Sequence, residues 1–211
     1  MIESPATPIR VAIVDDHPVV RDGTAALLAA EPELAVVGVA GSIVEAAPFM
    51  DRSAVDVLLL DIRLGQSSGF DLLASPVAEG DPPRPAIVVV TAYDYPQYTE
   101  AALRLGASGL VLKTAPIGEL VDAIRRAADG GLVFARRPAG PVARLTPREL
   151  DVVRLVVDGR SNDEIAVALG IGPRTVETHL GRVFERLDIA SRTELATRAV
   201  REGWLDAPPL A

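Results

Sequence analysis

The chain contains 211 residues, 49% of them hydrophobic, with a formal net charge of -8, so it can form one large domain or two small ones with real cores. It has no cysteine, which excludes disulfides and thiolate metal sites, and its two histidines lie far apart, so any bound metal should be a hard, oxygen-bound ion. No stretch approaches the roughly 18 uninterrupted apolar residues of a membrane span, and the N-terminus lacks a signal-peptide pattern. We therefore expect a cytoplasmic protein with no membrane partner.

The charge is unevenly shared along the chain. Residues 1–143 carry 11 basic and 18 acidic side chains, whereas residues 144–211 carry 10 and 11. An acidic half beside a nearly neutral, arginine-rich half fits two domains with different partners. The Gly-, Pro- and Arg-rich stretch between them lacks periodicity and is typical of a linker. We predict a first domain over 8–130, a linker over 131–144 and a second domain over 145–206.

In the first half, short apolar runs alternate with amphipathic stretches at helical spacing. This alternation predicts a five-stranded parallel sheet covered by helices on both faces, which is a doubly wound α/β fold. Right-handed crossovers bring all strand ends to one edge, where the ligand crevice of such a sheet lies. The expected strands are 9–14, 34–39, 55–60, 86–90 and 109–112, and the expected helices are 19–30, 42–51, 69–78, 96–105 and 116–129.

Functional side chains follow four of these five strands. Asp15 and Asp16 follow the first strand, Asp61 the third and Thr91 the fourth, while Lys113, the only lysine of the chain, follows the fifth. A lysine is a compact point charge on a long stem that can reach one small anion. Carboxylates packed together share protons or bind a cation, and hard oxygen ligands suit Mg²⁺ or Mn²⁺.

These residues as a group predict a phosphoryl-transfer site, although a single aspartate after a strand is often only a turn former or helix cap. A carboxylate can act as a nucleophile toward a phosphoryl group if the charge of that group is neutralised. Such a transfer depends mainly on positioning and charge stabilisation, which a divalent ion, a lysine and a hydroxyl donor can supply.

Beyond residue 144 the pattern is entirely helical. Capping boxes at Thr146–Glu149 and Ser161–Glu164 begin the first two helices. A tight turn at 170–172 precedes a longer helix that runs from Pro173 to about Leu187, and Ser191 caps a last helix that ends near residue 203. A short helix, a glycine-containing turn and a longer amphipathic helix are typical of the helix-turn-helix motif.

The long helix has an apolar side, expected to pack on the first helix of the motif, and a polar side, expected to face a DNA major groove. Arg174 and Thr175 suit phosphate contacts, and Thr178 and Arg182 suit base edges. Glu177 either accepts from a cytosine amino group or forms a salt bridge at the rim, and we favour the salt bridge. The predicted DNA-binding residues are Arg174, Thr175, Glu177, Thr178, His179, Arg182 and Arg186.

Residues 9 to about 130 resemble the receiver domain of two-component response regulators. The matching motifs are Val14-Asp15-Asp16-His17-Pro18, Leu60-Asp61, Val90-Thr91-Ala92 and Leu112-Lys113. The resemblance implies the strand order 2-1-3-4-5. It implies Asp61 as the phosphoacceptor, a Mg²⁺ ion held by Asp15, Asp16, Asp61 and the backbone carbonyl of Arg63, a phosphoryl oxygen bound by Thr91, and Lys113 paired with the phosphoryl group.

Two features depart from the receiver pattern. After the phosphoacceptor the family usually has a proline and then Asp-Gly, whereas this chain has Gly65, Ser68 and Gly69 at those places. The altered loop is expected to be more flexible and to change the rate of autodephosphorylation. Three residues before the lysine the family often has an aromatic side chain that swings inward with the threonine, and here that residue is Leu110.

Residues 145 to about 203 resemble the LuxR-type helix-turn-helix domain. The matching motifs are Leu145-Thr146-Pro147-Arg148-Glu149, Ser161-Asn162-Asp163-Glu164-Ile165-Ala166 and Arg174-Thr175-Val176-Glu177-Thr178-His179-Leu180. The resemblance implies a four-helix, all-α domain whose last helix, here 193–201, mediates dimer contacts. A nearly neutral domain should have modest non-specific affinity, so we expect a homodimer on double-stranded DNA.

A receiver joined to this domain is the architecture of the NarL/FixJ class. The chain is therefore interpreted as a transcription factor that a sensor histidine kinase controls by phosphorylating Asp61. The main alternative is an orphan regulator controlled by a partner or ligand without phosphorylation. A phosphatase with an aspartyl nucleophile is a remote alternative, because such enzymes generally need a second aspartate where this chain has Arg63.

Overall fold

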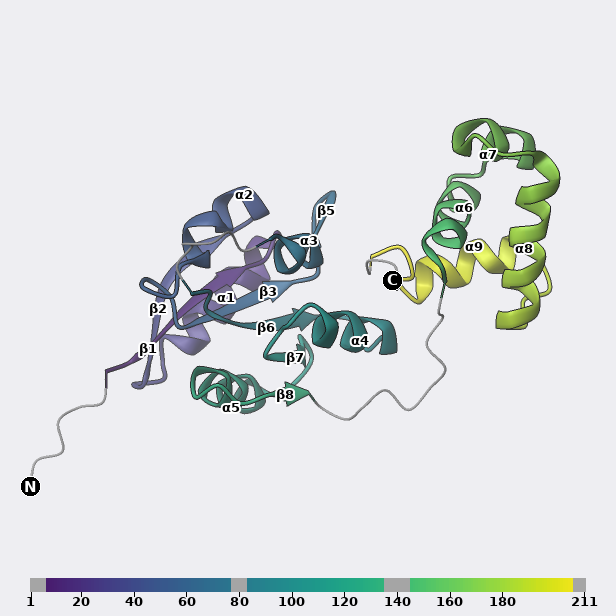
Figure 1. The fold of residues 1–211 in the computed structure, drawn as a ribbon. Coiled ribbons are helices and arrows are strands. Elements are labelled where there is room, and N and C mark those ends of the chain that lie inside the picture. Colours follow the sequence, from purple (N-terminus) through teal and green to yellow (C-terminus); the bar gives the residue numbers. More distant parts are fainter. Residues whose placement is uncertain (1–6, 77–82, 135–144, 207–211) are drawn as a thin grey trace, which may run out of the picture. The chain divides into compact units, whose positions relative to one another are not determined.

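The computed structural model describes residues 7–76, 83–134 and 145–206. The chain divides into two compact units, which are described separately (Figure 1). Among the described residues, no helix combines the length and the apolar character that crossing a membrane requires.

The first unit is built on a parallel sheet with the strand order β2-β1-β3-β6-β7-β8. The first five strands in this order confirm the predicted arrangement 2-1-3-4-5. The sixth, β8, was missed, because it is only two residues long and lies inside the predicted linker. The strands are β1 (Ile9–Val14), β2 (Leu34–Ala40), β3 (Val57–Asp61), β6 (Ala86–Thr91), β7 (Gly109–Leu112) and β8 (Val133–Phe134).

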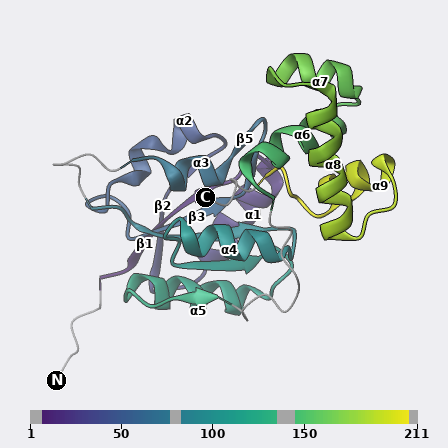
Figure 2. The ribbon, with the colours of Figure 1, turned by 45° about the vertical axis from the view of Figure 1, so that its right-hand side comes forward.

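Alternation along the buried strands gives each face of the sheet its own apolar layer. Val57 and Leu59 join Leu28 of α1 and Ile124 of α5 in one core. Figures 1 and 2 show α2 and α3 on one side of the strands and α5 on the other. The helices are α1 (Pro18–Leu28), α2 (Ile43–Ala46), α3 (Gly69–Ala74), α4 (Pro96–Arg104) and α5 (Ile117–Ala128).

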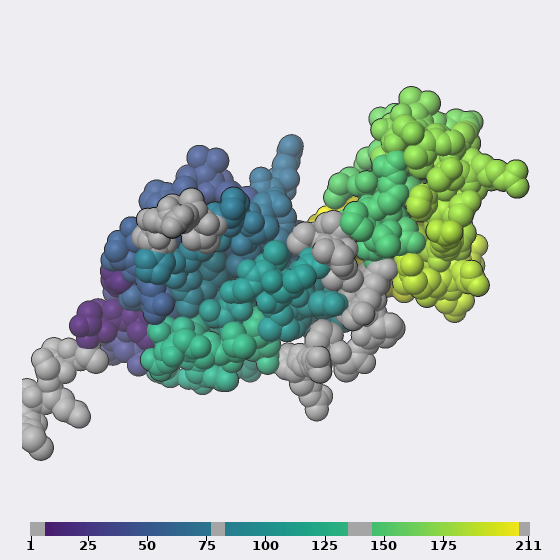
Figure 3. All heavy atoms as spheres, in the orientation of Figure 1, coloured from purple at the N-terminus to yellow at the C-terminus, as the bar shows by residue number. Residues whose placement is uncertain are grey.

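Two local features differ from the sequence prediction. The helix expected over 42–51 ends as α2 at Ala46 and continues as a 3₁₀ turn, η1 (Ala47–Met50), where Pro48 cannot donate an α-helical hydrogen bond. The loop after Asp61, where no strand was predicted, contains an antiparallel pair formed by β4 (Arg63–Leu64) and β5 (Ser67–Ser68). This hairpin stands out from the surface of its unit (Figure 3).

The second unit contains four helices in the described residues, as predicted: α6 (Pro147–Val157), α7 (Asn162–Leu169), α8 (Pro173–Leu187) and α9 (Arg192–Arg201). Both predicted capping boxes are formed, because the Thr146 and Ser161 side chains accept from the amides of Glu149 and Glu164. Gly170 ends α7 in the left-handed conformation with φ of 64°. The four helices share one core that includes Val153, Ile165, Val183, Leu195 and Trp204.

Candidate functional site

The predicted strand-end side chains meet at one edge of the sheet. Lys113 Nζ lies 2.7 Å from Asp61 Oδ2 and 2.7 Å from Asp15 Oδ2. The side chain of Lys113 is 15% exposed and each carboxylate is 6% exposed. One ammonium therefore bridges two nearly buried carboxylates that stand 46 positions apart in the chain, which is possible because parallel strands end at the same edge.

Burial controls the electrostatics of this cluster. Burial raises the pKa of Asp61 above its ordinary value, and the hydrogen bond and charge of Lys113 offset only part of that effect. Burial alone would lower the pKa of Lys113, but its hydrogen bonds to Asp15 and Asp61 outweigh burial and raise that pKa. The lysine is therefore held in its cationic form beside the carboxylate at the end of β3.

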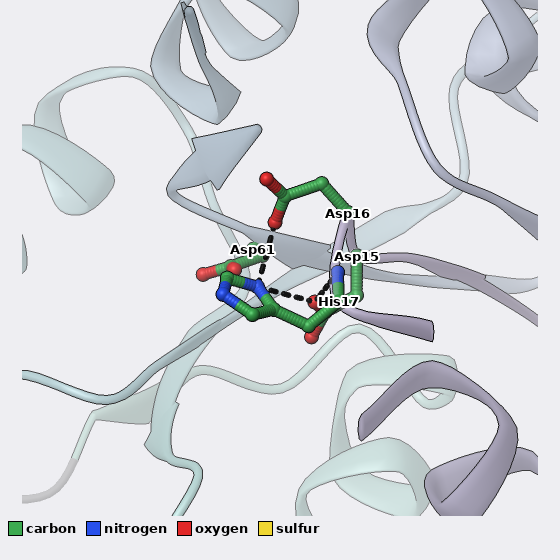
Figure 4. Close-up of side chains that lie close together, drawn as sticks. All are labelled: Asp15, Asp16, His17 and Asp61. Atoms are coloured by element: carbon green, nitrogen blue, oxygen red, sulfur yellow. Dashed lines mark hydrogen bonds and ion pairs between the residues drawn. The ribbon is translucent and has the colours of Figure 1, made fainter. Parts of the chain in front are cut away.

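A second group of contacts surrounds the acidic pair after β1 (Figure 4). The Nδ1 atom of His17 lies 2.7 Å from Asp16 Oδ1 and 3.4 Å from Asp15 Oδ1. Ligand atoms of Asp15, Asp16, His17 and Asp61 all lie within 4.8 Å of one another. Three carboxylates this close form a hard oxygen donor set that fits Mg²⁺ or Mn²⁺. The sequence prediction missed the proximity of His17, although the residue is adjacent to the acidic pair.

The hairpin after Asp61 reaches this acidic pair. Gly65, which occupies the place of the family's proline, has φ of 63° and donates its backbone N–H to Asp16 Oδ2 at 2.8 Å. A proline there could neither adopt this φ nor make this hydrogen bond. Ser68, which replaces the family's aspartate, forms the N-cap of α3 by accepting from Phe70 N at 3.2 Å. The residues that depart from the family pattern in this loop therefore form a hairpin with its own contacts.

Gly69 retains the family's glycine for a steric reason. A Cβ atom at this position would lie 2.1 Å from the backbone oxygen of Asp61. The close approach lets Gly69 N donate to Ile62 O at 2.7 Å, which holds the start of α3 against the end of β3. The absence of a side chain at Gly69 thus helps to position the Asp61 backbone.

Thr91 and Lys113 come from adjacent strands, and Lys113 N donates to Thr91 O at 2.7 Å. The Thr91 side chain is buried, and its hydroxyl oxygen accepts from Tyr93 N at 3.2 Å. The aromatic ring of Tyr93 lies under the guanidinium of Arg63, whose backbone N–H is bonded to Asp61. Tyr93 thus links the segment that follows β6 to the hairpin that follows Asp61.

Leu110 occupies the inner part of β7, where the family often has an aromatic residue. It pairs in register with Val89 on β6 and with Phe134 on β8. Leu110, Thr99 and Phe134 line an open cavity of about 710 Å³. An aromatic side chain therefore stands on the neighbouring strand β8, not on β7.

In the second unit, α8 presents most of the predicted DNA-binding side chains to solvent. Val176, Leu180 and Val183 are buried in the domain core, as predicted for the apolar side. Six of the seven predicted residues are exposed, and His179 is half-buried. The exposed residues are Arg174, Thr175, Glu177, Thr178, Arg182 and Arg186. The helix therefore has the amphipathic form that a major-groove reader needs.

Several arginines of this domain are engaged in structural contacts. Arg148 donates to Leu169 O at 2.6 Å at the end of α7, and Arg198 donates to Leu187 O at 3.0 Å at the end of α8. Arg192 donates to Asn162 Oδ1 at 3.0 Å. Arg186, predicted as a DNA contact, lies 2.7 Å from Glu149 Oε2 on α6. Arg186 on α8 is thus paired with a carboxylate of the neighbouring helix α6.

The fold and the strand-end cluster define a class of signalling proteins in which a receiver domain is joined to a helix-turn-helix DNA-binding domain. Comparisons with known families agree. Residues 11–125 match the response regulator receiver domain, and residues 143–199 match the bacterial regulatory proteins of the luxR family.

The transcriptional regulatory protein UhpA of Salmonella typhimurium is 36% identical over 201 residues, which cover 93% of this chain and 100% of UhpA. The nitrate/nitrite response regulator protein NarP of Escherichia coli is 35% identical over 200 residues, covering 89% and 92%. The crystal structure of the response regulator ChrA of a heme-sensing two-component system matches with a TM-score of 0.52 and 31% identity, covering 93% and 98%. The receiver domain of Mycobacterium tuberculosis NarL matches with a TM-score of 0.53 and 31% identity, covering 59% and 98%.

The chain therefore belongs to the NarL/FixJ class of two-component response regulators. Its role is that of a DNA-binding transcription regulator, as the sequence interpretation predicted.

Proposed function

We propose that Asp61 accepts a phosphoryl group from the phosphohistidine of a sensor kinase and that this reaction controls DNA binding. The contact of Lys113 Nζ with Asp61 Oδ2 at 2.7 Å carries the proposal, because it provides a cation beside the carboxylate that would become an acyl phosphate. A carboxylate oxygen of Asp61 attacks phosphorus, the P–N bond to the imidazole breaks, and the departing imidazole retains the bonding electron pair. Lys113 and the Thr91 hydroxyl are then available to the phosphoryl oxygens.

The donor set beside Asp61 supports a resident divalent cation. Asp15, Asp16, Asp61 and the backbone carbonyl of Arg63 would hold Mg²⁺ or Mn²⁺. When bound, the ion would neutralise charge on the transferred group. Lys113 contacts two of the three carboxylates but compensates the charge of only one, so the remaining negative charge favours a divalent cation.

The second domain would act as the output. Arg174 and Thr175 are proposed to contact phosphates, and Thr178 and Arg182 base edges, with Glu177 and His179 beside them. We propose that the active form is a homodimer in which α9 contributes to the contact. We assign residues 8–130 to the receiver, extended by β8 to Phe134, and residues 145–206 to the DNA-binding domain.

Asp61→Asn tests the phosphoacceptor. Incubating the full chain with a small-molecule phosphodonor and Mg²⁺ should label the wild-type protein at one acid-labile site, and the variant should not be labelled. Asp122→Asn is the matched control, because its side chain is 69% exposed on α5, and it should be labelled normally. Undiminished labelling of Asp61→Asn would reject the assignment.

An orphan regulator that does not use phosphorylation is the second candidate, favoured by Leu110 in place of an aromatic residue on β7. It predicts that the wild-type chain takes up no phosphoryl group at any Mg²⁺ concentration. Autodephosphorylation belongs to the first proposal, which predicts that label on Asp61 decays spontaneously in water.

A further inference from the structure

Arg186 lies in the last turn of α8, where its side chain forms an ion pair with Glu149 of α6. Successive helical residues rotate by about 100°, so each step of four residues advances about 40° around the axis. Three such steps separate Arg174 from Arg186, which places Arg186 about 120° around the axis from Arg174, between the exposed Thr175 and the half-buried His179. Arg186 therefore stands at the border between the polar side and the buried stripe formed by Val176, Leu180 and Val183.

At this border Arg186 meets Glu149, one of the most buried charged residues of the second unit. Arg186 Nη2 donates to Glu149 Oε2 at 2.7 Å. The Glu149 side chain is only 5% exposed, whereas that of Arg186 is 41% exposed. Without Arg186 this carboxylate would keep only the donors of its own capping box, so the arginine compensates a charge that is nearly buried.

Glu149 is also the third helical residue of α6 and belongs to the capping box whose N-cap is Thr146. Its Oε2 atom accepts from Thr146 N at 2.8 Å and from the Thr146 hydroxyl at 3.0 Å. One carboxylate oxygen thus joins the first turn of α6 to the last turn of α8. Burial opposes ionisation of Glu149, but the bonds from Arg186 and Thr146 outweigh it and lower its pKa.

We propose that Arg186 is a positioning residue that fixes the C-terminal half of α8 through Glu149 and does not contact DNA. The inference rests on the proposed function of α8 as the DNA-contacting helix. Arg198 holds the same end of α8 by donating to Leu187 O at 3.0 Å. The cap of α6 and the end of α8 therefore form one polar network, while the groups for DNA lie toward the N-terminal part of the helix.

The salt dependence of DNA binding separates positioning from direct contact. The slope of log affinity against log salt decreases in magnitude by about 0.9 for each phosphate that the protein no longer neutralises. We would measure the affinity of the full chain for a short random-sequence DNA duplex over a series of salt concentrations. The variants are Arg186→Met, Glu149→Gln and the double substitution, with Arg174→Met as the control for a phosphate-binding residue. Fluorescence of Trp204, the only tryptophan, verifies that the second domain of each variant is folded.

Arg186→Met and Glu149→Gln should each weaken binding by between about twofold and thirtyfold, with the wild-type salt slope. The double variant should bind no more weakly than the weaker single variant, because both changes break one network. Arg174→Met should reduce the slope by about 0.9 per protomer.

Three outcomes would overturn the proposal. A slope reduced in Arg186→Met as much as in Arg174→Met would identify Arg186 as a phosphate-binding residue. Wild-type affinity in both folded single variants would limit the pair to a stabilising role. A wild-type slope in Arg174→Met would instead reject α8 as the DNA-contacting helix, and the positioning role would fall with it.

Discussion

The guanidinium carbon of Arg63 lies 4.4 Å from the centroid of the Tyr93 ring, and its Nη1 donates to the Tyr93 hydroxyl at 3.2 Å. Arg63 belongs to the hairpin after Asp61, and Tyr93 follows Thr91 by two residues. The contact between Arg63 and Tyr93 therefore connects two loops that flank the proposed phosphoacceptor, Asp61.

Replacing Tyr93 should measure what this contact contributes. Tyr93→Leu should lower the free energy of unfolding of the receiver by about 0.5–1 kcal/mol, the range of an exposed cation–π contact. Tyr93→Phe keeps the ring and should lose less. Urea denaturation followed by far-UV circular dichroism provides the measurement. Equal losses in the two variants would show that the hydroxyl group, not the ring, anchors Arg63.

Gly65 should tolerate neither a side chain nor a proline. Gly65→Ala should destabilise the receiver by about 1 kcal/mol, because φ of 63° is costly for any residue with a Cβ atom. Gly65→Pro should cost about 1–3 kcal/mol more, because it also removes the N–H bonded to Asp16. Urea unfolding is followed by circular dichroism, which reports on both domains, and by Trp204 fluorescence, which reports on the second domain. The transition seen only by circular dichroism belongs to the receiver. Equal stability of Gly65→Pro and the wild type would contradict the hairpin geometry.

Gly69→Ala should affect both stability and phosphorylation. The added methyl group would overlap the Asp61 carbonyl at 2.1 Å, so the backbone must shift at a cost of about 1–3 kcal/mol. The shift displaces Asp61, and labelling by a small-molecule phosphodonor should slow.

Gly23→Ala is the matched control for that substitution, because no atom lies within 4 Å of a Cβ at this helical position. It should stabilise the receiver by about 0.5–1 kcal/mol and leave labelling unchanged. A labelling rate in Gly69→Ala equal to that of Gly23→Ala would reject the steric argument.

The DNA-binding domain should owe part of its stability to the ionised Glu149. The pKa of Glu149 is lowered by folding, so this contribution is present above the unfolded value of about 4.5 and is lost as pH falls through the folded pKa. Glu149→Gln should therefore lose about 1.5–3 kcal/mol at pH near 7, and the difference from the wild type should vanish in acid. Urea denaturation followed by Trp204 fluorescence between neutral and acid pH measures this difference. A difference that stays constant with pH would exclude a role for the charge.

Local patterns determined much of this protein. The alternation of strands and helices predicted a parallel sheet with helices on both faces, and the resemblance to receiver domains implied the order of its first five strands. Right-handed crossovers, which bring the strand ends to one edge, predicted that Asp15, Asp61 and Lys113 would meet. Capping boxes located the helices of the second unit, since a cap depends only on residues within one turn.

The tertiary structure decided what depends on partners far apart in sequence. Strand β8 forms because β7 offers an open edge, and two residues carry too little periodicity to show it. The hydrogen bond from Gly65 N to Asp16 Oδ2 depends on the position of the hairpin beside the acidic pair. The partner of Arg186 depends on the packing of α8 against α6. A helix turns about 100° per residue, so positions spaced four apart gradually move around its axis. The last residue of such a row can therefore contact the neighbouring helix.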